Sequence, residues 1–139
     1  MSRRLRAFML ATDIGFLVYW IITALQVLPK ELLYKDYNND IAMAWNWSFV
    51  PLDLVISVTG LLAIYYFKRD NPQWLPLSII SLTLTFCSGL QAISFWVIRM
   101  DFDWMWWAPN LLLLVYPLFF LPGLVCRFTQ SAAKIGGAA

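Results

Sequence analysis

Two carboxylates lie inside stretches of sequence that are otherwise apolar, and they are the residues best placed to do chemistry. Asp13 belongs to the run 7–28 and Asp53 to the run 45–67. A charged side chain in hydrocarbon costs ~2.5 kcal/mol or more, so it is retained where it pairs, faces water or serves a function. An acid in this setting can bind a cation, accept a hydrogen bond or exchange a proton.

Asp53 shares a helical face with other polar or small side chains. Asn46, Ser57 and Gly60 are placed around it at intervals of seven, four and three residues, which a helix brings to one side. Later runs carry further hydrogen-bonding groups: Ser81, Thr85, Ser88, Gln91 and Asn110. We expect the serines and threonines to bond across a helix bundle. For Asp53, Gln91 and Asn110 we expect a role that faces a ligand or handles a proton.

Asp13 has a different setting. It lies about two turns into its run and is expected near the side of the membrane opposite to that of Asp53. Basic and phenolic side chains are expected near the same level and could pair with it: Tyr65, Tyr66, Lys68 and Arg127. We therefore expect a structural role for this second intramembrane acid.

The elements that position these residues follow from length and composition. Of the 139 residues 61% are hydrophobic and 13% are charged, more apolar side chain than a soluble core of this size could hide. Four runs are long enough to cross a bilayer as helices: 7–28, 45–67, 74–97 and 104–125. They are apolar all round, which excludes an alternating barrel pattern. The sequence predicts an all-α membrane protein, an antiparallel bundle of four transmembrane helices in one domain (1–130) with a disordered cytoplasmic tail (131–139).

The distribution of charge predicts the orientation. With the N-terminus inside, seven lysines and arginines fall on the inner side and three on the outer side: Arg3, Arg4, Arg6, Lys68, Arg69, Arg127 and Lys134 against Lys30, Lys35 and Arg99. The positive-inside rule then places both termini in the cytoplasm. The net charge of +2 is an orientation signal, so we expect the lipid bilayer, and no nucleic acid, as a partner.

Composition also bears on cofactors. The chain has no histidine, the commonest metal ligand, and its two cysteines, Cys87 and Cys126, are expected at different depths. We expect no metal site, no cofactor and no disulfide.

Tryptophans gather near the outer interface, where they either anchor the helices or wall a pocket; Trp47, Trp96 and Trp107 are the candidate wall residues.

The sequence resembles known families at these residues. The segments 44–49 (AWNWSF) and 51–53 (PLD) resemble the YvaD-like group of small bacterial membrane proteins, whose function is not established. This resemblance implies a multi-pass protein of the plasma membrane. Spans two to four are more distantly similar to the EXPERA group of the emopamil-binding sterol isomerase and the sigma-2 receptor, in which the segment 48–55 matches the helix that carries an intramembrane acid.

The resemblance implies an EXPERA-like packing in which Asp53 is the matching acid. Two departures limit what it implies. The receptor-like proteins carry a second acid where this chain has Thr23 and Ala24, and the isomerases use a histidine that is absent here. The resemblance therefore supports a cavity that faces lipid better than it supports sterol isomerisation.

Three functions compete. The first is binding of a hydrophobic or amphipathic small molecule, a cationic amine or a lipid, in an intramembrane cavity centred on Asp53. The second is a proton-coupled exporter similar to the small multidrug transporters, with Asp13 as the exchanging acid and room for a homodimer. The third is an isomerase-like membrane enzyme, which we rank last because the outer half lacks an evident second acid or base.

Overall fold

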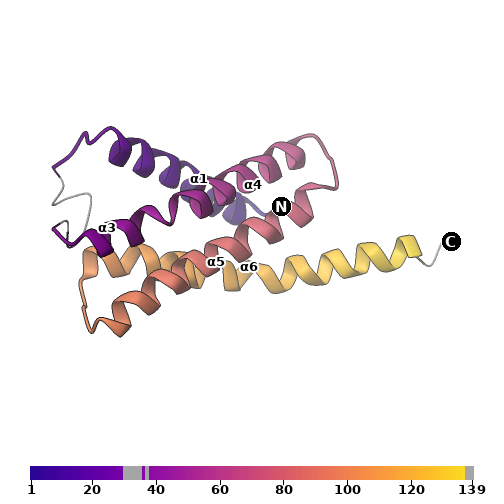
Figure 1. Cartoon of the computed structure of the whole chain (residues 1–139). Coiled ribbons are helices and arrows are strands. Elements are labelled where there is room, and N and C mark those ends of the chain that lie inside the picture. The colour runs from indigo at the N-terminus through magenta and orange to yellow at the C-terminus, as the bar shows by residue number, and fades with distance from the viewer. Residues whose placement is uncertain (30–35, 37, 137–139) are drawn as a thin grey trace.

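Four long helices form the part of the chain that the structure describes. The structure is a computed structural model that describes residues 1–29, 36 and 38–136, with side chains as far as residue 133. The long helices are α1 (Arg3–Ala24), α4 (Val50–Lys68), α5 (Trp74–Ile98) and α6 (Trp104–Gly136) (Figure 1). A short helix, α3 (Asp40–Trp47), precedes α4. All four spans are long and apolar enough to cross a membrane, which confirms the predicted fold class.

Because the spans alternate in direction, both chain ends belong to one end of the bundle. We call it the terminal end, and the opposite end, which carries α3, the loop end. Burial lowers the pKa of the Met1 amine, and the nearby guanidinium groups of Arg127 and Arg6 lower it further. The start of the chain therefore lies close to α6 at the terminal end.

The helix boundaries follow local signals. α1 begins at Arg3 because the Ser2 hydroxyl accepts a hydrogen bond from the Leu5 amide (3.2 Å), and it ends before Gln26, whose φ of 49° is left-handed. α3 and α4 are separate because Pro51 has no amide hydrogen, so the chain turns at residues 48–49 and restarts with proline in the first turn. The predicted second span is thus a short helix followed by a long one.

Helix α6 continues further than the sequence predicts. It passes through Pro109, Pro117 and Pro122 and ends at Gly136, so residues 131–136 are helical where the sequence predicted a disordered tail. Alanine, glutamine and lysine in this segment favour a helix, and no helix breaker precedes the glycine pair at 136–137. The rest of the predicted tail, residues 137–139, lies outside the described residues.

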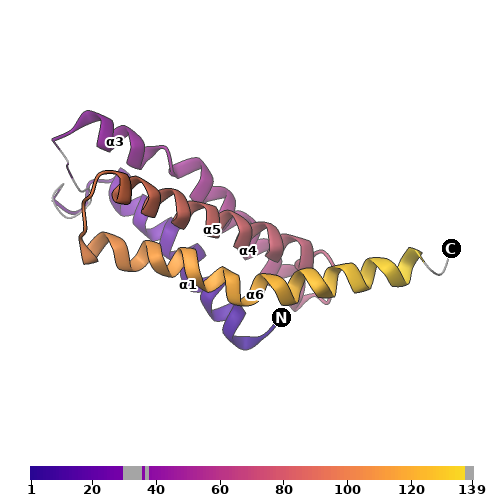
Figure 2. The same cartoon turned by 90° about the horizontal axis from the view of Figure 1, so that it is seen from below.

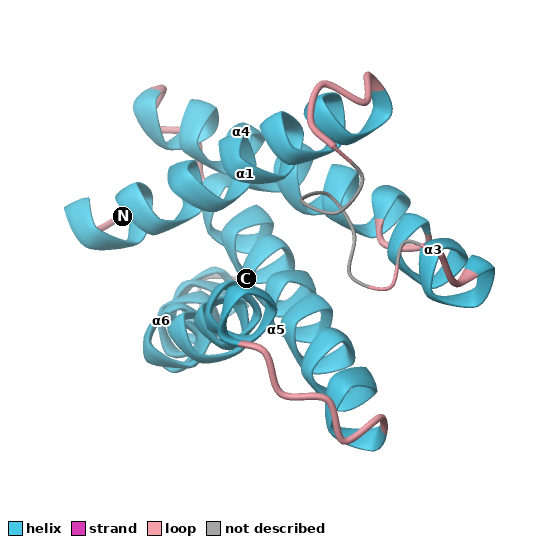
Figure 3. Ribbon diagram, turned by 90° about the vertical axis from the view of Figure 1, so that its left-hand side faces the viewer, coloured by secondary structure: helices cyan, strands magenta, loops and turns pink. Residues whose placement is uncertain are grey.

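The helices pack as two neighbouring pairs. α5 lies against α6 and α1 against α4, and the contact between α4 and α5 joins the pairs, whereas α1 and α6 touch very little (Figures 2 and 3). Apolar side chains fill the terminal half, where Met9, Ala63 and Leu82 are almost fully buried. At that end Phe8 of α1 stacks on Tyr116 of α6, with ring centroids 5.1 Å apart. The bundle is therefore closed in its terminal half.

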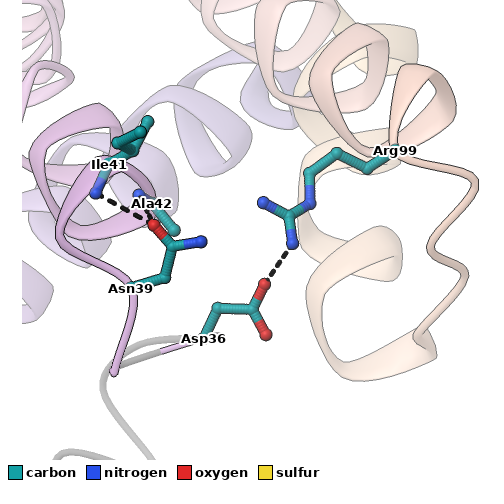
Figure 4. A network of polar contacts seen from close by, with 5 residues as sticks. All are labelled: Asp36, Asn39, Ile41, Ala42 and Arg99. Atoms are coloured by element: carbon teal, nitrogen blue, oxygen red, sulfur yellow. Dashed lines mark hydrogen bonds and ion pairs between the residues drawn. The ribbon is translucent and has the colours of Figure 1, made fainter.

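The loop end is held by short polar contacts. The Asn39 side chain caps α3 by accepting hydrogen bonds from the amides of Ile41 (3.0 Å) and Ala42 (3.2 Å) (Figure 4). Asp36 forms an ion pair with Arg99, which links the first loop to the end of α5. Both side chains are about one-third exposed, so this pair contributes little stability by itself.

Candidate functional site

A cavity of about 460 Å³ extends from α3 at the loop end as far as Phe8 in the first half of α1. Its back wall consists of buried residues of α4 and α5: Asp53, Ser88, Ala92 and Trp96. Its two sides are formed by α1 and α6, and several of those lining residues are exposed: Phe8, Ala11, Gly15, Pro109 and Leu112. Because α1 and α6 scarcely meet and carry the exposed lining residues, the cavity opens between these two helices.

Asp53 supplies the only carboxylate among the described residues that line this cavity. It lies in the first turn of α4, where the helix dipole favours a negative charge, and it is 4% exposed. The indole nitrogen of Trp20 donates to Oδ2 (2.9 Å) and the hydroxyl of Ser88 donates to Oδ1 (3.2 Å). Both donors are neutral, and no lysine or arginine among the described residues forms an ion pair with it.

The short helix α3 covers the loop end of the cavity. Trp45 lines it while stacking on Phe95, with centroids 3.8 Å apart, and meeting Trp96 edge-on. Asn46 also lines it, and its side-chain nitrogen donates to the hydroxyl of Tyr19 on α1 (3.3 Å). These contacts close the cavity toward the loop end and leave the side between α1 and α6 open.

The structure brings some predicted site residues together and separates others. Asp53, Asn46, Asn110 and Trp96 line the cavity. Gln91 does not: it is exposed and borders a second, smaller space of about 210 Å³. The reason is helical phase, since Ser88, Ala92 and Trp96 recur every four residues along the cavity wall and Gln91 falls on the other flank.

Two predicted tryptophans also lie elsewhere. Trp47 faces the ring of Trp20 at 5.6 Å and is not among the lining residues. Trp107 donates its indole hydrogen to the Asp101 carbonyl (3.0 Å) and packs on Phe102. Besides the predicted Trp96, three other tryptophans line the cavity: Trp20, Trp45 and Trp106. Trp45 is two positions before Trp47, and Trp106 is one position before Trp107.

Asp13 does not line the cavity, although Thr12 and Gly15 beside it on α1 do. The predicted pairing with basic or phenolic side chains was wrong, because neither of its carboxyl oxygens has a hydrogen-bond partner among the described residues. Arg127 lies over the ring of Trp74 (5.2 Å) instead, near the start of α5. Asp13 is 1% exposed and packs against Gly60 of α4.

Comparisons with known proteins match most of the chain. The model of a family of unknown function, DUF5360, matches residues 5–131. This protein belongs to the DUF5360 family. A relative from Bacillus subtilis (strain 168), described as uncharacterized protein YvaD, is 47% identical over 119 residues, which cover 86% of this chain and 90% of the relative. No solved structure matches.

Trp20 is one of the site residues of this DUF5360 chain that sequence reasoning missed. A signal was present, because Trp20 lies inside a span rather than at an interface, and an indole N–H in hydrocarbon requires an acceptor. Asp53 is that acceptor. Gly15 was missed as well, since a glycine gives no signal of a wall until the facing helices are known.

Replacing Trp20 with phenylalanine in this DUF5360 protein should lower its free energy of unfolding by about 1 kcal/mol, because one oxygen of Asp53 loses its donor. Denaturation by sodium dodecyl sulfate in detergent micelles, followed by circular dichroism, measures the change. Trp104→Phe is the matched control, because Trp104 is 78% exposed. Equal losses in the two variants would contradict the assigned role of the Trp20–Asp53 hydrogen bond.

Proposed function

We propose that this protein binds a hydrophobic or amphipathic small molecule or a lipid in the cavity at Asp53. The observation that carries the proposal is a buried carboxylate that lines a cavity and is held by two neutral donors, with no cation paired to it among the residues that the structure describes. The volume of about 460 Å³ falls within the range of small-molecule sites. A ligand that brings a positive charge or a hydrogen-bond donor would complete the surroundings of Asp53.

The lining supports an amphipathic ligand. Asn46, Ser88 and Asn110 line the cavity as well as Asp53, and Ser88 is hydrogen-bonded to the carboxylate. Aromatic and aliphatic side chains line the remainder, as in Phe8, Phe16, Leu112 and Leu113. A molecule with a small polar head and an apolar body matches this division, and the opening between α1 and α6 would admit it from the lipid.

Two sequence features bear on the finer assignment. The resemblance of segment 48–55 to the acid-bearing helix of the EXPERA group supports Asp53 as the residue that faces the ligand. The seven-to-three excess of basic residues supports a cytoplasmic terminal end in a bacterial plasma membrane. Asp53, in the first turn of α4, then lies in the outer half of the bilayer.

Native mass spectrometry of the detergent-purified protein, with lipid extraction, tests the proposal. The wild type should carry a co-purifying small molecule or lipid, and Asp53→Asn should bind the identified molecule about tenfold more weakly, the effect of one lost charge-assisted hydrogen bond. Circular dichroism should show that the variant remains helical. A ligand-free wild type, or equal binding by both forms, would contradict the role of Asp53.

A second variant tests the cavity without touching Asp53. Gly15 lines the cavity, and a Cβ at this position would meet nothing within 4 Å, so Gly15→Leu should place its side chain in the space and displace the ligand. Gly123→Leu is the matched control: a Cβ there also meets nothing within 4 Å, but Gly123 does not line the cavity. Bound ligand should be lost from the first variant and kept in the second.

A further inference from the structure

Asp13 is a buried acid that the proposed ligand cavity does not use. It is 1% exposed, and both of its carboxyl oxygens lack a hydrogen-bond partner among the described residues. Almost all buried polar atoms in folded proteins are hydrogen-bonded, so an acid with two unbonded oxygens calls for an explanation.

The carboxyl group occupies a notch in the facing helix. A Cβ built on Gly60 of α4 would lie 2.1 Å from Asp13 Oδ2 and 2.6 Å from its Cγ. No other residue type fits at position 60 while Asp13 stays in place. The absent side chain of Gly60 is therefore what allows α1 to approach α4 at this level.

Next to the notch, a hydrogen bond joins the same two helices. The Ser57 hydroxyl of α4 lies 3.1 Å from the carbonyl oxygen of Asp13 and 2.9 Å from that of Asp53, and donates to both. Asp13 is thus held through its backbone as well as through its side chain. The notch and this hydrogen bond therefore join α1 and α4 at neighbouring points.

The groups that face Asp13 in the described part of the chain carry no positive charge. α4 presents Gly60 and Ser57, and α6 presents the phenol of Tyr116, which also interacts with Thr12 of α1 and Thr85 of α5. Two guanidinium groups of the terminal end lie over aromatic rings instead, Arg69 over Tyr65 (4.6 Å) and Arg127 over Trp74 (5.2 Å). A carboxylate in the notch would be a buried charge with no counterion, whereas a carboxylic acid carries none.

We propose that Asp13 and Gly60 form a proton-binding site that holds α1 against α4. The protonated acid packs in the notch; when the proton leaves to water, the carboxylate moves out of the notch and α1 separates from α4. This site is distinct from the Asp53 cavity, and the proposal does not depend on a ligand being bound there.

Infrared spectroscopy of the full-length protein in lipid nanodiscs tests for the proton. The carbonyl stretch of a carboxylic acid is resolved from that of a carboxylate, so the wild type should show an acid band at neutral pH that Asp13→Asn lacks. Asp53→Asn is the control and should keep that band. If the spectra of wild type and Asp13→Asn agree in this region at every pH, the proposal is overturned.

A distance measurement tests the contact. Spin labels at Ile14 of α1 and Val58 of α4, which are 47% and 55% exposed, report the separation of the helices in a background without Cys87 and Cys126. The separation should increase as the pH rises in the wild type and in Asp53→Asn, and it should stay short in Asp13→Asn. A separation that does not respond to pH in the wild type, or that loses its response in Asp53→Asn, overturns the proposal.

Gly60→Ala provides a test that leaves both acids in place. Its Cβ excludes the carboxyl group from the notch, so the labels should be further apart at every pH and the acid band of Asp13 should be lost. Gly15→Ala is the matched control on α1, because its Cβ meets nothing within 4 Å. An acid band and a label distance in Gly60→Ala equal to those of the wild type would contradict the site.

Discussion

Trp45→Ala is expected to lower the free energy of unfolding by about 3 kcal/mol, the low end of the range for removing a packed tryptophan. Trp45 stacks on Phe95 at 3.8 Å with an interplanar angle of 12°, and it meets Phe49 at 4.9 Å and Trp96 at 5.6 Å nearly edge-on. These contacts join α3 to α4 and α5. Alanine would remove all three and leave a gap at the loop end of the cavity.

The expected loss can be measured by equilibrium denaturation with sodium dodecyl sulfate in micelles. Trp104→Ala is the control, because Trp104 has the same side chain near the same end of the bundle but is 78% exposed. Its substitution should change the free energy of unfolding by about 0.5 kcal/mol or less. If the two alanine variants lose the same stability, the aromatic cluster is not what holds α3 in place.

Gly89→Ala should destabilise the bundle by about 2 kcal/mol, because α5 and α6 touch backbone to backbone at this residue. A Cβ on Gly89 would lie 2.5 Å from the amide nitrogen of Leu114 and 2.9 Å from the carbonyl oxygen of Asn110. Neither group is the end of a flexible side chain, so the helices themselves would have to move apart. The movement would also shift Asn110, which lines the cavity.

Thermal and detergent denaturation of Gly89→Ala should both show the loss. Gly123→Ala is the control on α6, since its Cβ would meet nothing within 4 Å, and alanine favours a helix over glycine. That variant should be as stable as the wild type or more so. Unchanged stability in Gly89→Ala would mean that the two helices do not approach as closely as described.

The fold could be predicted from the sequence because it depends mainly on the lengths of the apolar runs, which can be read along the chain. A bilayer sets the length of a span, and apolar runs of that length can be counted along the chain. The ends of the helices depend on local chemistry that was not all recognised: the cap at Ser2, the effect of Pro51 on the second span, and the continuation of α6 to Gly136.

The candidate site was harder to predict because it depends on how helices rotate about their axes. The periodicity around Asp53 predicted that Ser57 and Gly60 share its face, and all three are buried. One residue changes the direction of a side chain by about 100°, which is why Ala92 lines the cavity and Gln91 does not. No pattern in a single helix states which flank the next helix will cover.

Asp13 illustrates the same limit. Its depth was foreseen, and the basic residues of the terminal end were reasonable partners at that depth. Its actual neighbour is Gly60, which has no side chain and therefore gives no attractive signal in the sequence. The pairing of an acid with an empty space becomes visible only when α1 and α4 are placed together.

The last part of helix α6 extends beyond the other helices of the bundle. Arg127 lies over Trp74, where α5 begins, and the described side chains beyond it, 128–133, are exposed. The helix still runs nine residues further, about 14 Å (Figure 1). A helical domain fused in phase onto this part of α6 would be carried rigidly outside the micelle, and it would give a 16.1 kDa membrane protein the mass that image alignment in electron cryomicroscopy requires.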